Sequence, residues 1–178
     1  TYARERGLLV VLDGKRNDIG STAEAYASAY LGELEIEGRS QRLWPADALT
    51  VNPYLGSEGI EPFLKEANRR QGGLFVLVRT SNPGAGKLQD RSLGPHRVYE
   101  EVADWVEGWS AASKSADGRY GAVGAVVGAT VPAQVGDLRR RMPHVWFLLP
   151  GYGAQGGSAR DTADAFDADG LGAVVNNS

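Results

Sequence analysis

Short apolar runs alternate along this chain with segments whose apolar residues recur at helical spacing. Six runs are continuous rather than alternating, as is typical of parallel strands covered on both faces. They are Leu8–Leu12, Leu49–Asn52, Leu74–Val78, Ala122–Val127, Val145–Leu149 and Ala173–Val175. Each run is followed at once by polar or glycine-rich residues. The pattern predicts buried strands that end at a common polar edge.

Helices are expected between these strands. The first is predicted to begin at Ser21, with Glu24 completing a capping box, and to end at Gly32. The second carries an apolar stripe that includes Ile60 and Phe63. A third covers residues 98–109, and weaker patterns cover about 133–141 and 159–166. This alternation predicts an α/β fold with a parallel sheet.

The polar residues after every strand favour a TIM (β/α)8 barrel over an open sheet, because all strands of a barrel end at one shared face. A barrel of this kind usually needs about 250 residues, and this chain has 178. We therefore expect about strands 3 to 8, with two βα units before Thr1 and a last helix after Ser178. Residues 1–178 are interpreted as a single, partial catalytic domain.

Composition narrows the class of protein. Apolar residues make up 42% of the chain, charged residues make up 23%, and the net charge is −3. No basic stripe suggests a nucleic-acid partner, and no apolar run approaches the roughly 18 to 20 residues of a membrane span. There is no cysteine, so disulfides are excluded and a cytoplasmic location is expected.

A charged motif follows the first predicted strand. Asp13 and Lys15 are two residues apart, so in a strand their side chains point the same way, and Asp18 follows. A lysine buried beside carboxylates stays protonated and can give a proton to a carbanion. A solvated salt bridge in a surface turn is the alternative interpretation.

Two loops after later strands offer groups for binding. Ser81 precedes Asn82-Pro83-Gly84, a strong turn signal, and could offer its hydroxyl and amide to a heterocyclic amide. Residues 150–157, Pro-Gly-Tyr-Gly-Ala-Gln-Gly-Gly, allow close approach of the backbone to an anion. The alternative interpretation of both loops is that their residues serve only the conformation of the turn. Residues 86–95 are interpreted as a lid or as an inert loop.

Three other residues receive plainer interpretations. Thr130 is expected to be the N-cap of the helix that follows it, or to lie near that cap, with Pro132 in the first turn. His96 and His144 are expected to be unpartnered surface or capping residues. No metal site is expected, because two isolated histidines do not supply a ligand set.

The three motifs together resemble the orotidine 5′-monophosphate decarboxylase family, in its bacterial long-chain subgroup. The family pattern Asp-x-Lys-x-x-Asp-Ile, followed by Thr, is similar to Asp13 through Thr22. Its Ser-x-Pro-Gly-Ala loop resembles residues 81–85, and its phosphate loop resembles residues 150–157. Gly14 and Asn17 stand where alanine and glycine are more usual.

The resemblance implies a carboxy-lyase that makes UMP from orotidine 5′-phosphate without cofactor or metal. It places Asp13 against the substrate carboxylate and makes Lys15 the proton donor to C6. Asp18 and Thr22 would reach the partner's site in a homodimer with shared active sites. Substrate-binding roles fall to the loop residues Ser81, Pro83, Gln155, Gly156 and Gly157.

Two alternatives remain. A Mg²⁺-dependent sugar-phosphate lyase of the same superfamily, of the keto-gulonate-phosphate decarboxylase or hexulose-phosphate synthase type, shares Asp-x-Lys-x-x-Asp. A non-catalytic phosphate-binding barrel fragment is the other. The family's strand-1 aspartate, strand-2 lysine and phosphate-binding arginine do not occur within these residues.

Overall fold

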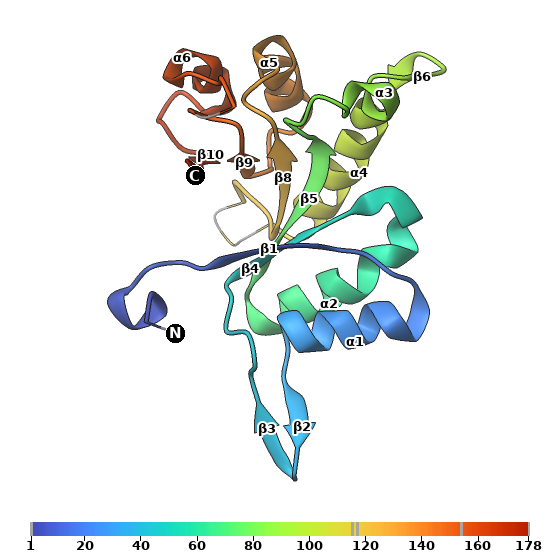
Figure 1. The fold of residues 1–178 in the computed structure, drawn as a ribbon, viewed down its shortest axis with the longest axis vertical. Helices are drawn as coiled ribbons and strands as arrows, with labels where there is room; N and C mark the ends of the chain where they lie inside the picture. Colours follow the sequence, from blue (N-terminus) through green and yellow to red (C-terminus); the bar gives the residue numbers. More distant parts are fainter. Residues whose placement is uncertain (1, 115, 117, 154, 178) are drawn as a thin grey trace. The chain divides into compact units, whose positions relative to one another are not determined.

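The strands form one main sheet, in the order β1-β4-β5-β8-β9-β10 (Figure 1). The computed structural model describes residues 2–114, 116, 118–153 and 155–177. The sheet strands are β1 Val11–Arg16, β4 Ala48–Val51, β5 Gly73–Arg79, β8 Val123–Val127, β9 Phe147–Leu149 and β10 Ala173–Val175. Each pairing described within the sheet is parallel. The predicted parallel α/β arrangement is therefore confirmed.

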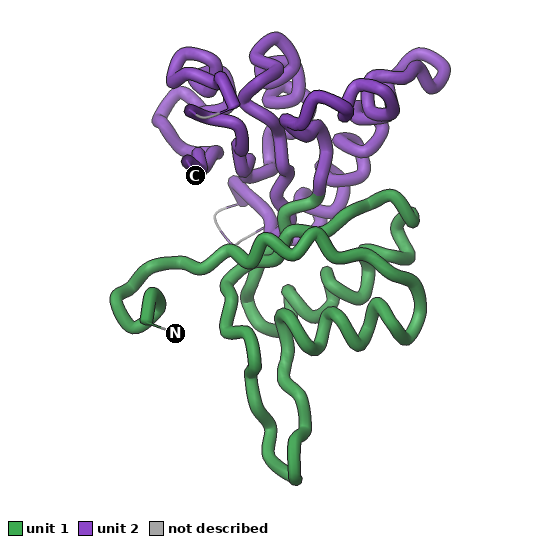
Figure 2. Tube along the Cα trace, viewed as in Figure 1, with its two compact units in different colours: residues 1–76 green, residues 77–178 purple. Residues whose placement is uncertain are grey.

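The chain divides into two compact units, residues 1–76 and 77–178, and the division falls within β5 (Figure 2). The first unit holds β1, β4 and the start of β5. The second unit holds the end of β5 with β8, β9 and β10.

In residues 1–76, two helices pack against each other beside the strands. They are α1 Gly20–Tyr30 and α2 Glu61–Arg70. All of β4 is buried, and Leu49 and Val51 join Phe63 of α2 in the core. The remaining elements are η1 Arg4–Arg6, η2 Pro53–Leu55, η3 Ser57–Gly59 and the antiparallel hairpin of β2 Leu34–Ile36 and β3 Arg39–Gln41.

In residues 77–178, helices α4 and α5 pack together, and α4 lies against β8, which is buried along its whole length. The helices are α3 Gly86–Gln89, α4 Val98–Ala112, α5 Pro132–Arg141, α6 Ala159–Thr162 and η4 Ala163–Ala165. A short hairpin of β6 Ser92–Leu93 and β7 His96–Arg97 precedes α4. Full burial of β4 and β8 explains why, apart from Thr50, these strands carry no polar side chain.

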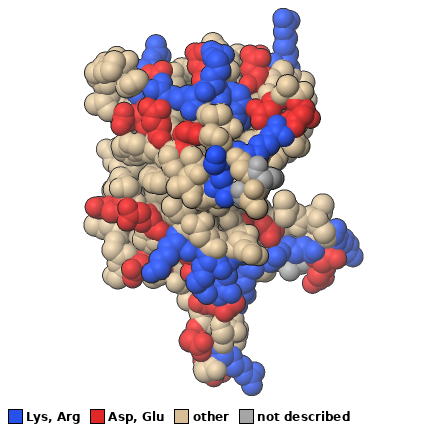
Figure 3. Space-filling view, turned by 180° about the vertical axis from the view of Figure 1, so that it is seen from behind, with Lys and Arg blue, Asp and Glu red and all other residues tan. Residues whose placement is uncertain are grey.

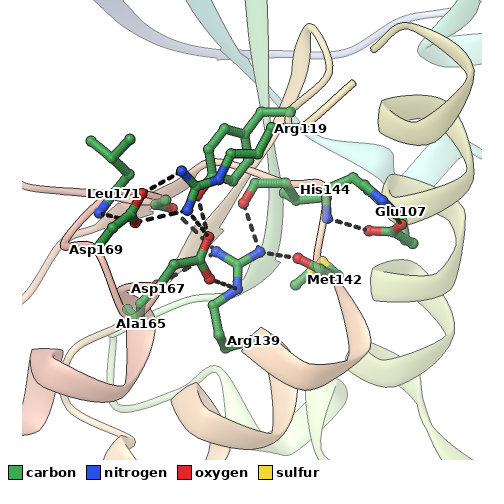
Figure 4. A network of polar contacts seen from close by, with 12 residues as sticks. Glu107, Arg119, Arg139, Met142, His144, Ala165, Asp167, Asp169 and Leu171 are labelled. Atoms are coloured by element: carbon green, nitrogen blue, oxygen red, sulfur yellow. Dashed lines mark hydrogen bonds and ion pairs between the residues drawn. The ribbon is translucent and has the colours of Figure 1, made fainter. Parts of the chain in front are cut away.

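A buried arginine joins the segments that lead into β9 and β10 (Figure 4). Arg139 of α5 donates to the carbonyl oxygens of Val145 at 2.9 Å and Gly172 at 3.2 Å, and also to that of Met142. Its Nε lies 3.9 Å from Asp167 Oδ1. Burial lowers the pKa of Arg139, and the charge of Asp167 opposes that shift. These bonds tie together the segments before β9 and β10, and the Gly172 carbonyl also accepts from the amide of Phe147 at 2.9 Å.

Two expectations about the start of the chain are wrong. The first strand runs from Val11 to Arg16 rather than over residues 8–12, and Leu9 is 84% exposed. The charged motif is therefore part of the strand. Pairing with β4 extends β1 as far as Arg16, beyond its apolar residues. The first helix begins at Gly20 after an extended Ile19, so Ser21 lies inside it and forms no capping box. Among the described residues, no helix is long and apolar enough to cross a membrane.

Candidate functional site

Asp13 and Lys15 form an ion pair on β1. The Lys15 Nζ atom lies 2.5 Å from Asp13 Oδ2. The second carboxylate oxygen of Asp13 accepts a hydrogen bond from Thr50 Oγ1 at 2.8 Å. Thr50 is on β4 and is buried. The two expected charged residues are therefore brought together, and a buried hydroxyl fixes the orientation of the carboxylate.

Thr50 also holds the backbone of Lys15. The amide of Lys15 donates to Thr50 Oγ1 at 2.9 Å, and the register between β1 and β4 shifts between Leu12 and Arg16. Lys15 has a φ of 47°, a left-handed conformation that is uncommon for a residue with a Cβ. Such local strain is often found at functional sites. Sequence reasoning missed Thr50, whose only signal was a hydroxyl within an apolar strand.

The pKa of Asp13 is lowered. Burial raises it, but the hydrogen bonds from Lys15 and Thr50, together with the charge of Lys15, outweigh that effect. The carboxylate is therefore ionised at neutral pH.

Burial of Lys15 was expected from the sequence, and this expectation is wrong for the described chain. The side chain of Lys15 is 53% exposed and that of Asp13 is 63% exposed. The reason is the position of β1 at the end of the strand order, where β4 is its one neighbouring strand in the described sheet. Asp18 accepts from the amide of Ile19 at 2.9 Å, and Thr22 is exposed on α1.

Ser81 lies just past the end of β5, in residues 77–178. Its carbonyl oxygen accepts a hydrogen bond from Thr130 Oγ1 at 3.1 Å. The preceding residue, Thr80, donates its amide to Gln89 Oε1 at 2.9 Å. Pro83 is exposed in the turn that follows. Thr130 directly precedes Val131, the N-cap of α5, and Pro132 is in the first turn, so Thr130 lies near the cap as expected.

The segment expected to be a lid or an inert loop is tied to β5 at its base. Arg79 donates from Nε and Nη2 to the two carboxylate oxygens of Asp90, both at 3.0 Å. The Arg79 side chain is only 8% exposed. A buried bidentate pair of this kind fixes geometry strongly. The tip of the hairpin remains exposed at Leu93.

Three glycines of residues 150–157, the glycine loop, have a left-handed backbone conformation. Gly151, Gly153 and Gly156 have φ values of 98°, 75° and 97°. The amide of Gly156 donates to the Gly153 carbonyl at 2.8 Å, and that of Gly157 donates to the Gly151 carbonyl at 3.0 Å. To donate to a phosphate, these two amides would have to give up their hydrogen bonds to the Gly153 and Gly151 carbonyls. Residue 154 lies outside the described residues.

The loop that carries Ser81 (residues 79–85, the serine loop) and the glycine loop approach each other at Gly151. A Cβ atom placed on Gly151 would lie 3.0 Å from Ser81 Cβ, 3.2 Å from Thr130 Cγ2 and 3.5 Å from Gln155 Oε1. The structure thus brings Ser81 and Gln155 together, as the binding hypothesis requires, and adds Thr130. The signal for Thr130 was its place just past an apolar strand.

Both histidines have partners, contrary to expectation. His144 Nδ1 lies 2.5 Å from Glu107 Oε1 (Figure 4). His96 Nδ1 lies 2.9 Å from an Arg141 guanidinium nitrogen. These contacts join helices and loops of residues 77–178. Within the described ranges, no group of three or more His, Asp or Glu side chains could hold a metal ion.

Charged side chains of both signs lie beside one another on the face drawn in Figure 3. Ion pairs occur in both units of the chain, such as Arg70 with Glu33 at 2.7 Å and Arg141 with Asp104 at 2.5 Å. This agrees with the interspersed charges of the sequence.

The sequence model of the orotidine 5′-phosphate decarboxylase / HUMPS family matches residues 1–174. Two similar curated proteins are named orotidine 5′-phosphate decarboxylase. One, from Rhodopirellula baltica, is 56% identical over 178 residues, which are 100% of this chain and 58% of the relative. The other, from Caldicellulosiruptor bescii, is 44% identical over 99% of this chain and 58% of the relative. The chain thus spans less than two thirds of these relatives.

Solved structures show the same likeness. Leishmania donovani OMP decarboxylase gives a TM-score of 0.77 at 38% identity, over 96% of this chain and 59% of that chain. Leishmania donovani UMP synthase gives a TM-score of 0.79 at 40% identity, over 96% of this chain and 34% of that chain. With the six-stranded sheet, these likenesses confirm the expected partial α/β barrel.

Proposed function

This chain belongs to the orotidine 5′-phosphate decarboxylase / HUMPS family, and from that premise we propose that it forms much of an enzyme converting orotidine 5′-phosphate to UMP and CO₂. The observation that carries the proposal is the Asp13–Lys15 ion pair, in which Thr50 holds the carboxylate. It supplies an anion and a proton donor side by side.

In the proposed reaction the bond between C6 and the carboxylate carbon breaks, and CO₂ departs. The electron pair left on C6 takes a proton from Lys15 Nζ. Asp13, ionised because of its lowered pKa, repels the substrate carboxylate and favours its loss. Asp13 also keeps the ammonium in place for the transfer. The proposed reaction uses no cofactor or metal.

The pyrimidine and phosphate would be bound by the cluster at Gly151. Ser81 offers its hydroxyl and amide to the pyrimidine, and Pro83 shapes the turn that presents them. Gln155 would bridge pyrimidine and phosphate, and the amides of Gly156 and Gly157 would turn to the phosphate. Binding energy gained far from C6 would then be used at the transition state.

We propose further that the enzyme is a cytoplasmic homodimer with shared active sites, in which Asp18 and Thr22 reach the partner's substrate. Asp18 follows the end of β1 and Thr22 is exposed on α1, which suits such a role. Sedimentation of the complete protein tests the dimer. A mixed dimer of Lys15→Ala and Asp18→Ala chains that regained activity would support shared sites.

The experiment that tests the function is a decarboxylation assay on the complete protein with orotidine 5′-phosphate. UMP formation that survives a chelator supports the proposal. Absence of UMP formation would overturn it, and activity on a sugar phosphate that is lost on chelation would favour the Mg²⁺-dependent lyase. Binding of a UMP analogue without turnover would favour a non-catalytic barrel.

A further inference from the structure

The main chain of Ser81 is held on more than one side. Gly128, at the end of β8, approaches so closely that a Cβ atom there would lie 2.8 Å from both the nitrogen and Cα of Ser81. Thr130 Oγ1 donates to the Ser81 carbonyl at 3.1 Å. The amide of Thr80 is bonded to the Gln89 side chain. These contacts leave the Ser81 peptide little freedom.

Thr130 differs from the other contacts because it faces both loops of the cluster. Its hydroxyl bonds the serine loop, while its methyl carbon would lie 3.2 Å from a Cβ on Gly151 in the glycine loop. Its hydroxyl makes no cap for α5, because that helix begins at Pro132 after Val131. A threonine is well suited to this place, since it offers a donor and a packing methyl on one stiff Cβ.

We infer that Thr130 is a positioning residue for pyrimidine binding: by fixing the Ser81 carbonyl it aims the Ser81 hydroxyl at the substrate. The inference rests on the proposed function, which places the pyrimidine at Ser81. Without the Thr130 donor the peptide that follows Ser81 can rotate, and the Ser81 hydroxyl shifts with it. A displaced hydroxyl binds the pyrimidine less well in the ground state and in the transition state alike, which raises KM.

The test compares variants of the complete protein. Thr130→Val removes the donor and keeps the shape, and Thr130→Ser keeps the donor. We expect Thr130→Val to lower kcat/KM by about tenfold, chiefly through KM, as loss of one hydrogen bond would. Thr130→Ser should restore most of this loss. Thr162→Val is the matched control, because it removes a hydroxyl that donates to the Ala159 carbonyl at 2.9 Å within α6. Thr162→Val should leave both kcat and KM unchanged.

A double variant separates positioning from general stability. In a Ser81→Ala background, Thr130→Val should lower kcat/KM by less than about twofold, because the hydroxyl it aims is gone. A full tenfold effect in that background, or an unchanged KM in Thr130→Val alone, would overturn the inference.

If the proposed function is wrong, the wild-type protein itself will show no decarboxylase activity. The inference is then decided by amide hydrogen exchange. Thr130→Val should speed exchange in residues 80–85 and leave α2 unchanged, and unchanged exchange in residues 80–85 would refute it.

Discussion

The ammonium of Lys15 and the carboxylate of Asp13 form an ion pair across a single intervening residue, with Nζ 2.5 Å from Oδ2. More than half of each side chain is exposed. An exposed pair adds only about 0–1 kcal/mol to stability. Its removal should therefore leave the fold intact, so that any loss of activity can be attributed to chemistry.

Lys15→Ala removes the proposed proton donor to C6. We expect turnover of orotidine 5′-phosphate to fall by orders of magnitude, while the melting temperature changes little. Steady-state kinetics and thermal unfolding of the complete protein measure the two effects. Lys65→Ala, which removes an exposed lysine on α2, is the control. Near-normal turnover in Lys15→Ala would refute the assignment of Lys15.

Thr50→Val removes the hydroxyl that bonds both Asp13 and the amide of Lys15. The pKa of Asp13 should rise from its lowered value, since one of the bonds that favours the carboxylate is lost. The unfolding free energy should fall by about 1–3 kcal/mol, because an amide loses its partner. A carboxyl-carbon NMR titration measures the pKa, and an unchanged value would contradict the role given to Thr50.

Gly128→Ala places a methyl group against the backbone of Ser81. The serine loop must shift, so kcat/KM should fall by about tenfold or more, with a loss of about 1–3 kcal/mol from overpacking. Gly108→Ala in α4 is the opposite case, because nothing lies within 4 Å of its added Cβ. It should raise stability by about 0.5–1 kcal/mol and leave the kinetics alone. Equal behaviour of the two variants would contradict this account.

Asp169→Asn should flatten the acid dependence of stability. Hydrogen bonds from Arg119 hold the pKa of Asp169 at about 2, below its usual 3.8. A carboxyl with a lowered folded pKa stabilises the protein above the unfolded pKa and loses that contribution as the pH falls through the folded pKa. The unfolding midpoint should therefore drop less between about pH 4 and pH 2 in Asp169→Asn than in the wild type. Denaturant titrations measure the midpoint at each pH. An equal drop in Asp169→Asn and in the wild type would contradict this role of Asp169.

Arg139→Leu tests the buried arginine that joins the ends of β9 and β10. The variant removes the side-chain donor to the Val145 carbonyl and one of the two donors to the Gly172 carbonyl. It also leaves Asp167 without one of its cations. Breaking a buried network of this kind costs about 3–5 kcal/mol. Chemical unfolding measures the loss, and Arg140→Leu, on the exposed side of α5, is the control. A loss below about 1 kcal/mol in Arg139→Leu would contradict the proposed role of the network.

Much of the fold was predictable because burial imposes patterns on sequence. The apolar runs of β4 and β8 are buried throughout, and continuous hydrophobicity predicts such strands. Boundaries were predicted less well. Apolar residues such as Leu9 suggested a strand at 8–12, but pairing with β4 places β1 three to four residues later. Ladder hydrogen bonds, which leave no mark on hydropathy, decided that register.

The sequence by itself determined the parallel α/β class, the family resemblance and the polar residues that end each strand, because local spacing and residue type encode them. Only the tertiary structure revealed Thr50 beneath Asp13 and Thr130 behind Ser81. Each of these hydroxyls lies more than thirty residues from its partner in the chain. A hydrogen bond between distant segments depends on how strands pair and loops approach, and a single hydroxyl in an apolar run carries no sign of its future partner.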